Sequence, residues 1–204
     1  MVETKLIETS VHGRYLVRPG DPNRMLVGFH GYAQTADIQL AEMEQIAGAG
    51  EWTLVSIQAL HPFYNRNQET GACWMTRQNR EEAIADNISY VRRVLATVPP
   101  PAKLVFTGFS QGAAMAWRAA ASNRCDGIVI LGGDAPPDVT ADLAPALIAR
   151  GREDDWYTSE KLNKDLSFLA NRCALTTFEF EGRHEWSDAF RAAAGDFLRM
   201  IESR

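Results

Sequence analysis

The sequence predicts an α/β protein with a mostly parallel central sheet of about eight strands and helices on both faces. From about residue 25 to the end, short β-rich runs alternate with segments of helical period, which is typical of successive βα units. The 204 residues are 46% hydrophobic and 23% charged, as in ordinary globular proteins with a packed core. The length favours one domain over residues 1–204 rather than two small ones.

Eight runs are predicted as strands, and the first two are separated by only a few residues that include Gly13. We therefore expect these two to pair as an antiparallel ribbon before the parallel part of the sheet begins. In chain order the predicted strands are residues 5–9, 14–17, 25–29, 53–57, 103–107, 127–131, 144–148 and 175–180.

Three segments are predicted as helices. Asn79 and Glu82 resemble a capping box in front of a helical stripe that comprises Ile84, Ile88, Val91 and Leu95. Residues 113–121 form a small-residue helix suited to lying against a sheet. The chain closes with an amphipathic helix whose apolar stripe comprises Trp186, Phe190, Ala193, Phe197 and Ile201. Loops are expected at residues 61–78, 99–101 and 132–139.

Charge and cysteine content exclude several classes of partner and location. With 21 basic and 26 acidic residues the net charge is −5, so no basic surplus is available for a nucleic acid. The first residues lack the apolar block of a secretion signal, and no run approaches the length of a membrane span. Cys73, Cys125 and Cys173 are odd in number and widely spaced, which favours reduced thiols. A cytoplasmic protein without a membrane span is expected.

A nucleophilic serine is predicted at Ser110. The segment Gly108-Phe109-Ser110-Gln111-Gly112 has the pattern G-x-S-x-G, follows a predicted strand and leads into a predicted helix. Such a sharp turn puts the serine in strained backbone geometry, and the two glycines remove the Cβ atoms that would collide. The alternative interpretation is a glycine-rich turn whose serine only caps the helix.

A serine hydroxyl needs a base, and His184 is the best placed of the four histidines. It follows the strand at 175–180 and precedes the last helix, so it lies at the carboxyl edge of the sheet. His12 and His61 are expected to be structural or solvated. A zinc motif H-E-x-x-H beginning at His184 is excluded because its fifth position is Asp188, so no metal is expected.

Two acids compete to orient the base. Asp154 follows the strand at 144–148, whereas Asp134 follows the strand at 127–131, and either loop would reach His184. We favour Asp154 because the order Ser110, Asp154, His184 is the one expected on this kind of sheet. The neighbours Glu153 and Asp155 are interpreted as solvated or as forming local turn hydrogen bonds.

Two backbone N–H groups are predicted to bind the oxyanion of the reaction. The N–H of Gln111 directly follows the nucleophile at a helix N-terminus, where negative charge is favoured. The second is the N–H of Tyr32, because Gly31 allows the loop after the strand at 25–29 to turn toward the site. His30 is interpreted as a residue that orients this loop rather than as a base.

These blocks together resemble the phospholipase/carboxylesterase family of α/β-hydrolases, which includes acyl-protein thioesterase-like enzymes and is related to dienelactone hydrolases. The resemblance covers about residues 25–200 and rests on His30-Gly31, Gly108-x-Ser110-x-Gly112, Gly151-x-x-Asp154 and His184. It implies the α/β-hydrolase fold, a triad of Ser110, Asp154 and His184, and oxyanion donors at Tyr32 and Gln111. The chain departs from dienelactone hydrolases, which use cysteine at the nucleophile, and has Arg150 where many family members have histidine.

Aromatic residues in the loops near the predicted site are expected to line an acyl or aromatic pocket. Trp186 also fits the core stripe of the last helix, and packing is its favoured interpretation. Only a short proline-containing segment separates the sixth and seventh strands, so no large lid domain is expected. The predicted pocket residues are Phe63, Tyr64, Trp74, Trp156 and Trp186.

The leading functional hypothesis is a serine hydrolase that cleaves small-molecule carboxylic esters or thioesters through an acyl-enzyme intermediate. This chemistry requires no cofactor, and a homo-oligomer is compatible with it. The alternative is a catalytically silent α/β-hydrolase fold that acts as a small-molecule or protein binding module, because a fold does not dictate a function.

Overall fold

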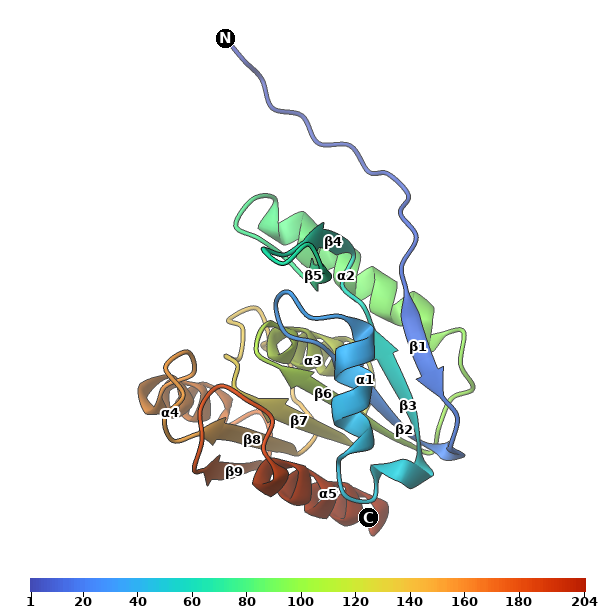
Figure 1. The fold of residues 1–204 in the computed structure, drawn as a ribbon, viewed down its shortest axis with the longest axis vertical. Coiled ribbons are helices and arrows are strands. Elements are labelled where there is room, and N and C mark those ends of the chain that lie inside the picture. Colours follow the sequence, from blue (N-terminus) through green and yellow to red (C-terminus); the bar gives the residue numbers. More distant parts are fainter.

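A seven-stranded sheet forms the centre of the computed structural model, which describes residues 1–204 (Figure 1). The strand order is β1-β3-β2-β6-β7-β8-β9; β1 runs antiparallel to β3, and all the other neighbours are parallel. The carboxyl ends of the six parallel strands therefore meet at one edge of the sheet. The strands are β1 (Tyr15–Arg18), β2 (Asp21–Phe29), β3 (Trp52–Ile57), β6 (Lys103–Phe109), β7 (Gly127–Leu131), β8 (Ala146–Gly151) and β9 (Leu175–Phe180).

Helices cover both faces of the sheet, as the sequence predicts (Figure 1). Successive strand residues point to opposite faces, so Phe106 lies in one apolar cluster with α2, α3 and α4, and Val105 in another with α1 and α5. β7 is buried on both faces, which explains its uninterrupted apolar sequence. The helices are α1 (Ala36–Glu44), α2 (Arg80–Leu95), α3 (Gln111–Ser122), α4 (Ser159–Leu169) and α5 (Asp188–Glu202), with a short 3-10 helix at Ala49–Glu51.

The predicted strand at residues 5–9 is wrong. Residues 1–13 are exposed, form no strand and project from the molecule (Figure 1). β1 pairs with β3 instead, with Tyr15 opposite Ile57. This pairing lets Tyr15 pack against the core, whereas Leu6 and Ile7 bury no surface that would hold a ribbon together. The main sheet therefore has seven strands rather than about eight.

A β-hairpin lies within residues 61–78, where only a loop is predicted. β4 (His61–Tyr64) and β5 (Thr70–Cys73) pair antiparallel, with Pro62 opposite Ala72. Asn65 closes the turn, because its side-chain oxygen accepts hydrogen bonds from the N–H groups of Asn67 and Glu69. The aromatic pair at 63–64, followed by turn-forming asparagines, is the signal that predicts such a hairpin.

The helix ends differ in detail from the predictions. α2 does begin after Asn79, but this residue is in the left-handed region at φ 49° and its side chain makes no capping hydrogen bond. The predicted capping box is therefore wrong, because a capping side chain needs an extended backbone at this position. α5 has a true cap, in which Ser187 Oγ accepts a hydrogen bond from the N–H of Phe190. None of the helices has the length and apolar character that crossing a membrane requires.

Docking of α5 on the sheet is tested by Phe190→Ala. Phe190 is fully buried in the cluster that joins α1 and α5 to the sheet, and such a truncation costs about 3 to 5 kcal/mol. We expect urea unfolding to show this loss. Ile7→Ala in the exposed N-terminal segment is the control and should stay within about 0.5 kcal/mol of the wild type. A similar small change for Phe190→Ala would contradict the packing described here.

Candidate active site

Ser110 occupies a strained turn between β6 and α3. Its backbone has φ 54° and ψ −118°, which a residue with a Cβ rarely adopts. A Cβ at Gly112 would overlap the carbonyl oxygen of Phe29, and one at Gly108 would overlap that of Gly112. The N–H of Ser110 donates to the carbonyl of Leu131 at 2.9 Å, so β7 also holds the turn. Ser110 therefore stands at the carboxyl edge of the sheet, where the sequence predicts it.

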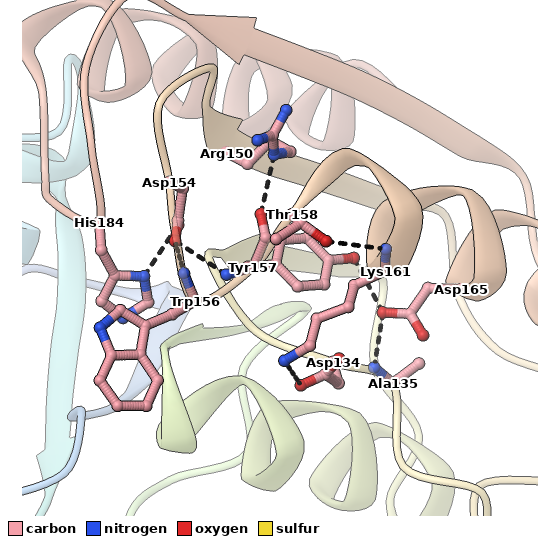
Figure 2. A network of polar contacts seen from close by, with 10 residues as sticks. All are labelled: Asp134, Ala135, Arg150, Asp154, Trp156, Tyr157, Thr158, Lys161, Asp165 and His184. Carbon is pink, nitrogen blue, oxygen red and sulfur yellow. Dashed lines mark hydrogen bonds and ion pairs between the residues drawn. The ribbon is translucent and has the colours of Figure 1, made fainter.

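His184 and Asp154 form a hydrogen-bonded pair (Figure 2). His184 Nδ1 lies 2.8 Å from Asp154 Oδ2, and Asp154 is only 3% exposed. The other carboxylate oxygen accepts the N–H groups of Trp156 and Tyr157, both at 2.8 Å. An ionised carboxylate only accepts hydrogen bonds, so in the neutral form of the imidazole this contact favours the tautomer with its proton on Nδ1 and its lone pair on Nε2.

Gly132 and Gly133, just after β7, lie between the His184–Asp154 pair and Ser110. A Cβ on Gly132 would lie 3.1 Å from His184 Nδ1 and 3.2 Å from Asp154 Oδ2, and one on Gly133 would overlap the carbonyl oxygen of Ser110. The ring of Phe109, the residue before the serine, packs on the His184 ring with centroids 4.9 Å apart. The structure thus brings all three predicted residues to one place, with no hydrogen bond from Ser110 to His184.

Asp134, the competing acid, does not contact His184. Its carboxylate is 57% exposed and accepts a hydrogen bond from Lys161 Nζ at 3.3 Å (Figure 2). Glu153 forms a long exposed ion pair with Arg183 at 3.8 Å, and Asp155 is exposed. Asp154 is therefore the one acid of the four that is placed to orient the imidazole.

The loop that carries Asp154 is anchored by a buried polar network (Figure 2). Arg150 Nε donates to the carbonyl of Tyr157 at 2.8 Å, and its Nη1 pairs with Glu179 at 2.6 Å. The Tyr157 hydroxyl donates to Asp165 Oδ2, which also accepts the N–H of Ala135. Burial raises the pKa of the Asp165 carboxyl and also that of the Tyr157 hydroxyl. The network joins β8, α4 and the segment after β7.

Sequence reasoning missed Asp165 and the role of Arg150. Asp165 lies within an ordinary amphipathic helix, where an acid every few residues carries no signal. Arg150 stood out only as a departure from the histidine of the resembled family. Arg150 is only 4% exposed, and its hydrogen bonds anchor the loop that carries Asp154.

The turn after β2 leaves one backbone donor without an acceptor in the protein. The N–H of Gln34 donates to the carbonyl of Gly31, and the Gln34 side chain accepts the N–H of Gly31 at 2.8 Å. The N–H of Tyr32 has no acceptor within the protein. A Cβ on Gly31 would lie 3.1 Å from the ring of Phe109, so this turn lies against the serine turn. The Tyr32 N–H is therefore free to bind a group from outside the protein.

His30 is hydrogen-bonded to the turn at Gly31, in agreement with its interpretation as a residue that orients this loop. It is fully buried; Nδ1 donates to the carbonyl of Gly31 at 2.7 Å, and Nε2 accepts the N–H of Ala59 at 3.0 Å. Burial lowers the pKa of His30 to about 4, so the ring is neutral in the folded protein near neutral pH.

Gln111, the second predicted oxyanion residue, begins α3, where the first N–H groups have no partner within the helix. Its side chain has a separate role: it accepts the N–H of Trp74 and donates to the carbonyl of Met75. The chain after β5 is thereby fixed to the serine turn.

The predicted pocket residues divide into three groups. Trp74 is fully buried and donates its Nε1–H to the carbonyl of His30, so its prediction as a pocket-lining residue is wrong. Trp186 is half-buried and packs on Phe109 and Phe190, which is the core role favoured for it. The remaining three are at the surface: Phe63 is half-buried, Tyr64 is 72% exposed and Trp156 is 74% exposed.

The fold matches that of solved esterases at low sequence identity. A Bacillus cereus carboxylesterase superposes with a TM-score of 0.77 and 15% identity, over 93% of this chain and 94% of that chain. A phospholipase/carboxylesterase from Dyadobacter fermentans gives 0.73 and 18%, over 94% and 99%. Acyl-protein thioesterase 2 of Zea mays gives 0.72 and 16%, over 93% and 99%. The chain has the α/β-hydrolase fold.

Comparison with protein-family models finds no match to this sequence, and comparison with curated protein sequences finds none either. The likeness is therefore one of fold.

The burial of His30 predicts a loss of stability in acid. Between about pH 6.5, where an imidazole titrates in the unfolded chain, and about pH 4 in the folded protein, only the unfolded state binds the proton. Stability therefore falls as the pH is lowered through this range. In His30→Gln the fall in the free energy of unfolding from about pH 7 to about pH 5 should be smaller by about 2 kcal/mol. Urea titrations at both pH values measure it, and equal falls in both proteins would contradict the assignment.

Proposed function

We propose that this chain is a serine hydrolase that cleaves carboxylic esters or thioesters through an acyl-enzyme, with Ser110 as nucleophile, His184 as base and Asp154 as the acid that orients it. The observation that carries the proposal is the His184–Asp154 hydrogen bond at 2.8 Å, placed across two glycines from a serine in a strained turn. The names of the structurally similar carboxylesterases and thioesterase support the same reaction class.

The proposed reaction has two halves. Ser110 Oγ attacks the carbonyl carbon while His184 Nε2 takes the hydroxyl proton, and the tetrahedral intermediate expels the alcohol or thiol, which receives that proton. Water then gives a proton to His184 and attacks the acyl group, and the acid leaves as Ser110 is protonated again. Asp154 keeps the proton on Nδ1 throughout and stabilises the imidazolium. Nε2 and Oγ approach when substrate binds, because such hydrogen bonds are often long in empty sites.

The negative charge of the tetrahedral intermediate needs fixed donors. The N–H of Tyr32, which has no protein acceptor, and that of Gln111, at the start of α3, are the proposed pair. Donors held by the backbone need no reorganisation during the reaction, so they favour the transition state over the planar ester. The proposed steps use only side chains, backbone groups and water, so no cofactor enters them.

We also propose a cytoplasmic, single-domain enzyme that acts on small molecules. The cytoplasmic location is supported by its three cysteines, which are free thiols, as is usual in a reducing compartment. Burial raises the pKa of the Cys125 thiol to about 12 and that of the Cys173 thiol to about 11. Such thiols are unreactive near neutral pH. No observed feature favours a catalytically silent binding module.

Removal of the nucleophile is the first test of this function. Ser110→Ala should lower kcat by about 10⁶-fold on whichever member of a panel of esters and thioesters, varied in acyl length and head group, the wild type cleaves fastest. The substitution removes one oxygen and keeps the Cβ, so the backbone of the turn should stay as it is, and an unchanged circular dichroism spectrum serves as the control. Hydrolysis by the purified variant at a rate near that of the wild type would end the proposed mechanism.

The two acids are separated by matched amide substitutions. Asp154→Asn should lower kcat by about 10⁴-fold, because an amide that donates to Nδ1 selects the wrong tautomer of His184. Asp134→Asn alters only an exposed pair with Lys161 and should change kcat less than about twofold. Steady-state rates on one activated ester decide the matter. A crippled Asp134→Asn beside a nearly normal Asp154→Asn would reverse the assignment of the acid.

A further inference from the structure

The β4–β5 hairpin is fastened to both halves of the candidate active site. The N–H of Ala33 donates to the carbonyl of Ala72, and the N–H of Ala72 donates to the carbonyl of Gln34, each at 3.0 Å. The side chain of Gln111 binds the backbone just after β5. The hairpin therefore forms a wall of the candidate site and is not an independent loop. A substrate bound at the Tyr32 N–H would lie beside this hairpin.

This wall carries a hollow next to Tyr32. The hollow has a volume of about 690 Å³ and is widely open to solvent. The rings of Tyr32 and Phe63 lie 5.3 Å apart at 33° and form its apolar side, and Tyr64 stands 72% exposed at its margin. Tyr32 is 60% exposed and Phe63 is half-buried, and adjacent aromatic rings provide a stacking surface for a flat ligand. Ala33, Asn65, Arg66 and Asn67 complete the lining.

The charge of the hollow is positive and unpaired. Arg66 forms neither a hydrogen bond nor an ion pair in the protein, and no acid lines the hollow. The one acid of the hairpin turn, Glu69, accepts a hydrogen bond from the Asn65 amide and lies outside the lining. A guanidinium beside aromatic rings suits a planar carboxylate in particular, because its donors match both oxygens.

We propose that this hollow selects esters in which an aromatic ring bearing an anionic group, such as a carboxylate, is attached to the reacting ester. The ring stacks on Tyr32 and Phe63, and Arg66 pairs with the anion. The inference rests on the proposed function and names its substrate class. The ring belongs to the alcohol part or to the acyl part of the ester, and the two substrate series below distinguish them.

The test compares anionic and neutral partners of the same shape. In the first series the substrates are 4-acetoxybenzoate and its methyl ester at the carboxylate, with the ring in the leaving group. In the second they are monomethyl and dimethyl terephthalate, with the ring in the acyl group. The ratio of kcat/KM for the anionic over the neutral substrate is measured for the wild type, Arg66→Gln and Arg124→Gln. Comparing ratios between proteins cancels the intrinsic reactivity of each ester.

Arg66→Gln should lower this ratio about fivefold in one of the two series, through KM of the anionic substrate, as expected for loss of one partly exposed ion pair. Arg124→Gln is the control, because Arg124 is an exposed arginine just before β7, at the opposite edge of the sheet. Its ratios should match those of the wild type. Unchanged ratios for Arg66→Gln in both series, or equal changes for Arg124→Gln, would overturn the proposal.

A binding measurement separates this proposal from the proposed function. In the Ser110→Ala background, 4-hydroxybenzoate and terephthalate are titrated by calorimetry, and adding Arg66→Gln should raise Kd of one of them about fivefold. If Kd of both ligands is the same with and without Arg66→Gln, the aryl-anion site is overturned even if the wild type cleaves esters. Absence of ester cleavage by the wild type, with the difference in Kd retained, overturns the proposed function and leaves the binding site.

Discussion

The approach of backbone to backbone around Ser110 is the constraint on which the rest of the site depends. Gly108, Gly112 and Gly133 each face a carbonyl oxygen at a distance that leaves no room for a Cβ. The serine can be held at φ 54° only because the strands on either side, β2 and β7, fix the turn through these contacts. The strain is stored where the proposed chemistry needs an exposed hydroxyl beside a helix N-terminus.

The acid and base are held by a different kind of structure, a polar network in the adjoining loops. Asp154 is fixed by two backbone N–H groups, and the loop that supplies them is tied to Arg150 and, through Tyr157, to Asp165 (Figure 2). A buried network of this kind is costly unless every member is paired, and here each of these members is. The result is a carboxylate with one oxygen committed to the loop and the other to His184.

Much of the fold and the core of the site follows from the sequence, because strands, the glycine-flanked serine and the chain order of acid and base leave local patterns. What the sequence does not reveal depends on contacts between distant segments. The burial of Trp74 is an example, because it depends on the carbonyl of His30, which no local pattern records. The hairpin of Phe63 is different: its strands are close in the chain, and its aromatic pair and asparagines are a local signal that the prediction of a loop overlooked. The strand expected at residues 5–9 is absent for the converse reason. Its local sequence pattern is typical of a strand, but no neighbouring strand pairs with this segment.

The central claim is that Ser110 becomes covalently acylated, and mapping the acyl group tests it most directly. The protein is mixed with an activated ester, quenched in acid within one turnover and digested, and the modified peptide is sequenced by mass spectrometry. The account predicts an acyl group on Ser110 in the wild type and no acylated peptide at this position in Ser110→Ala, because the serine oxygen forms the ester bond. Turnover of the ester with an acyl group on another residue, or with none at all, would contradict it.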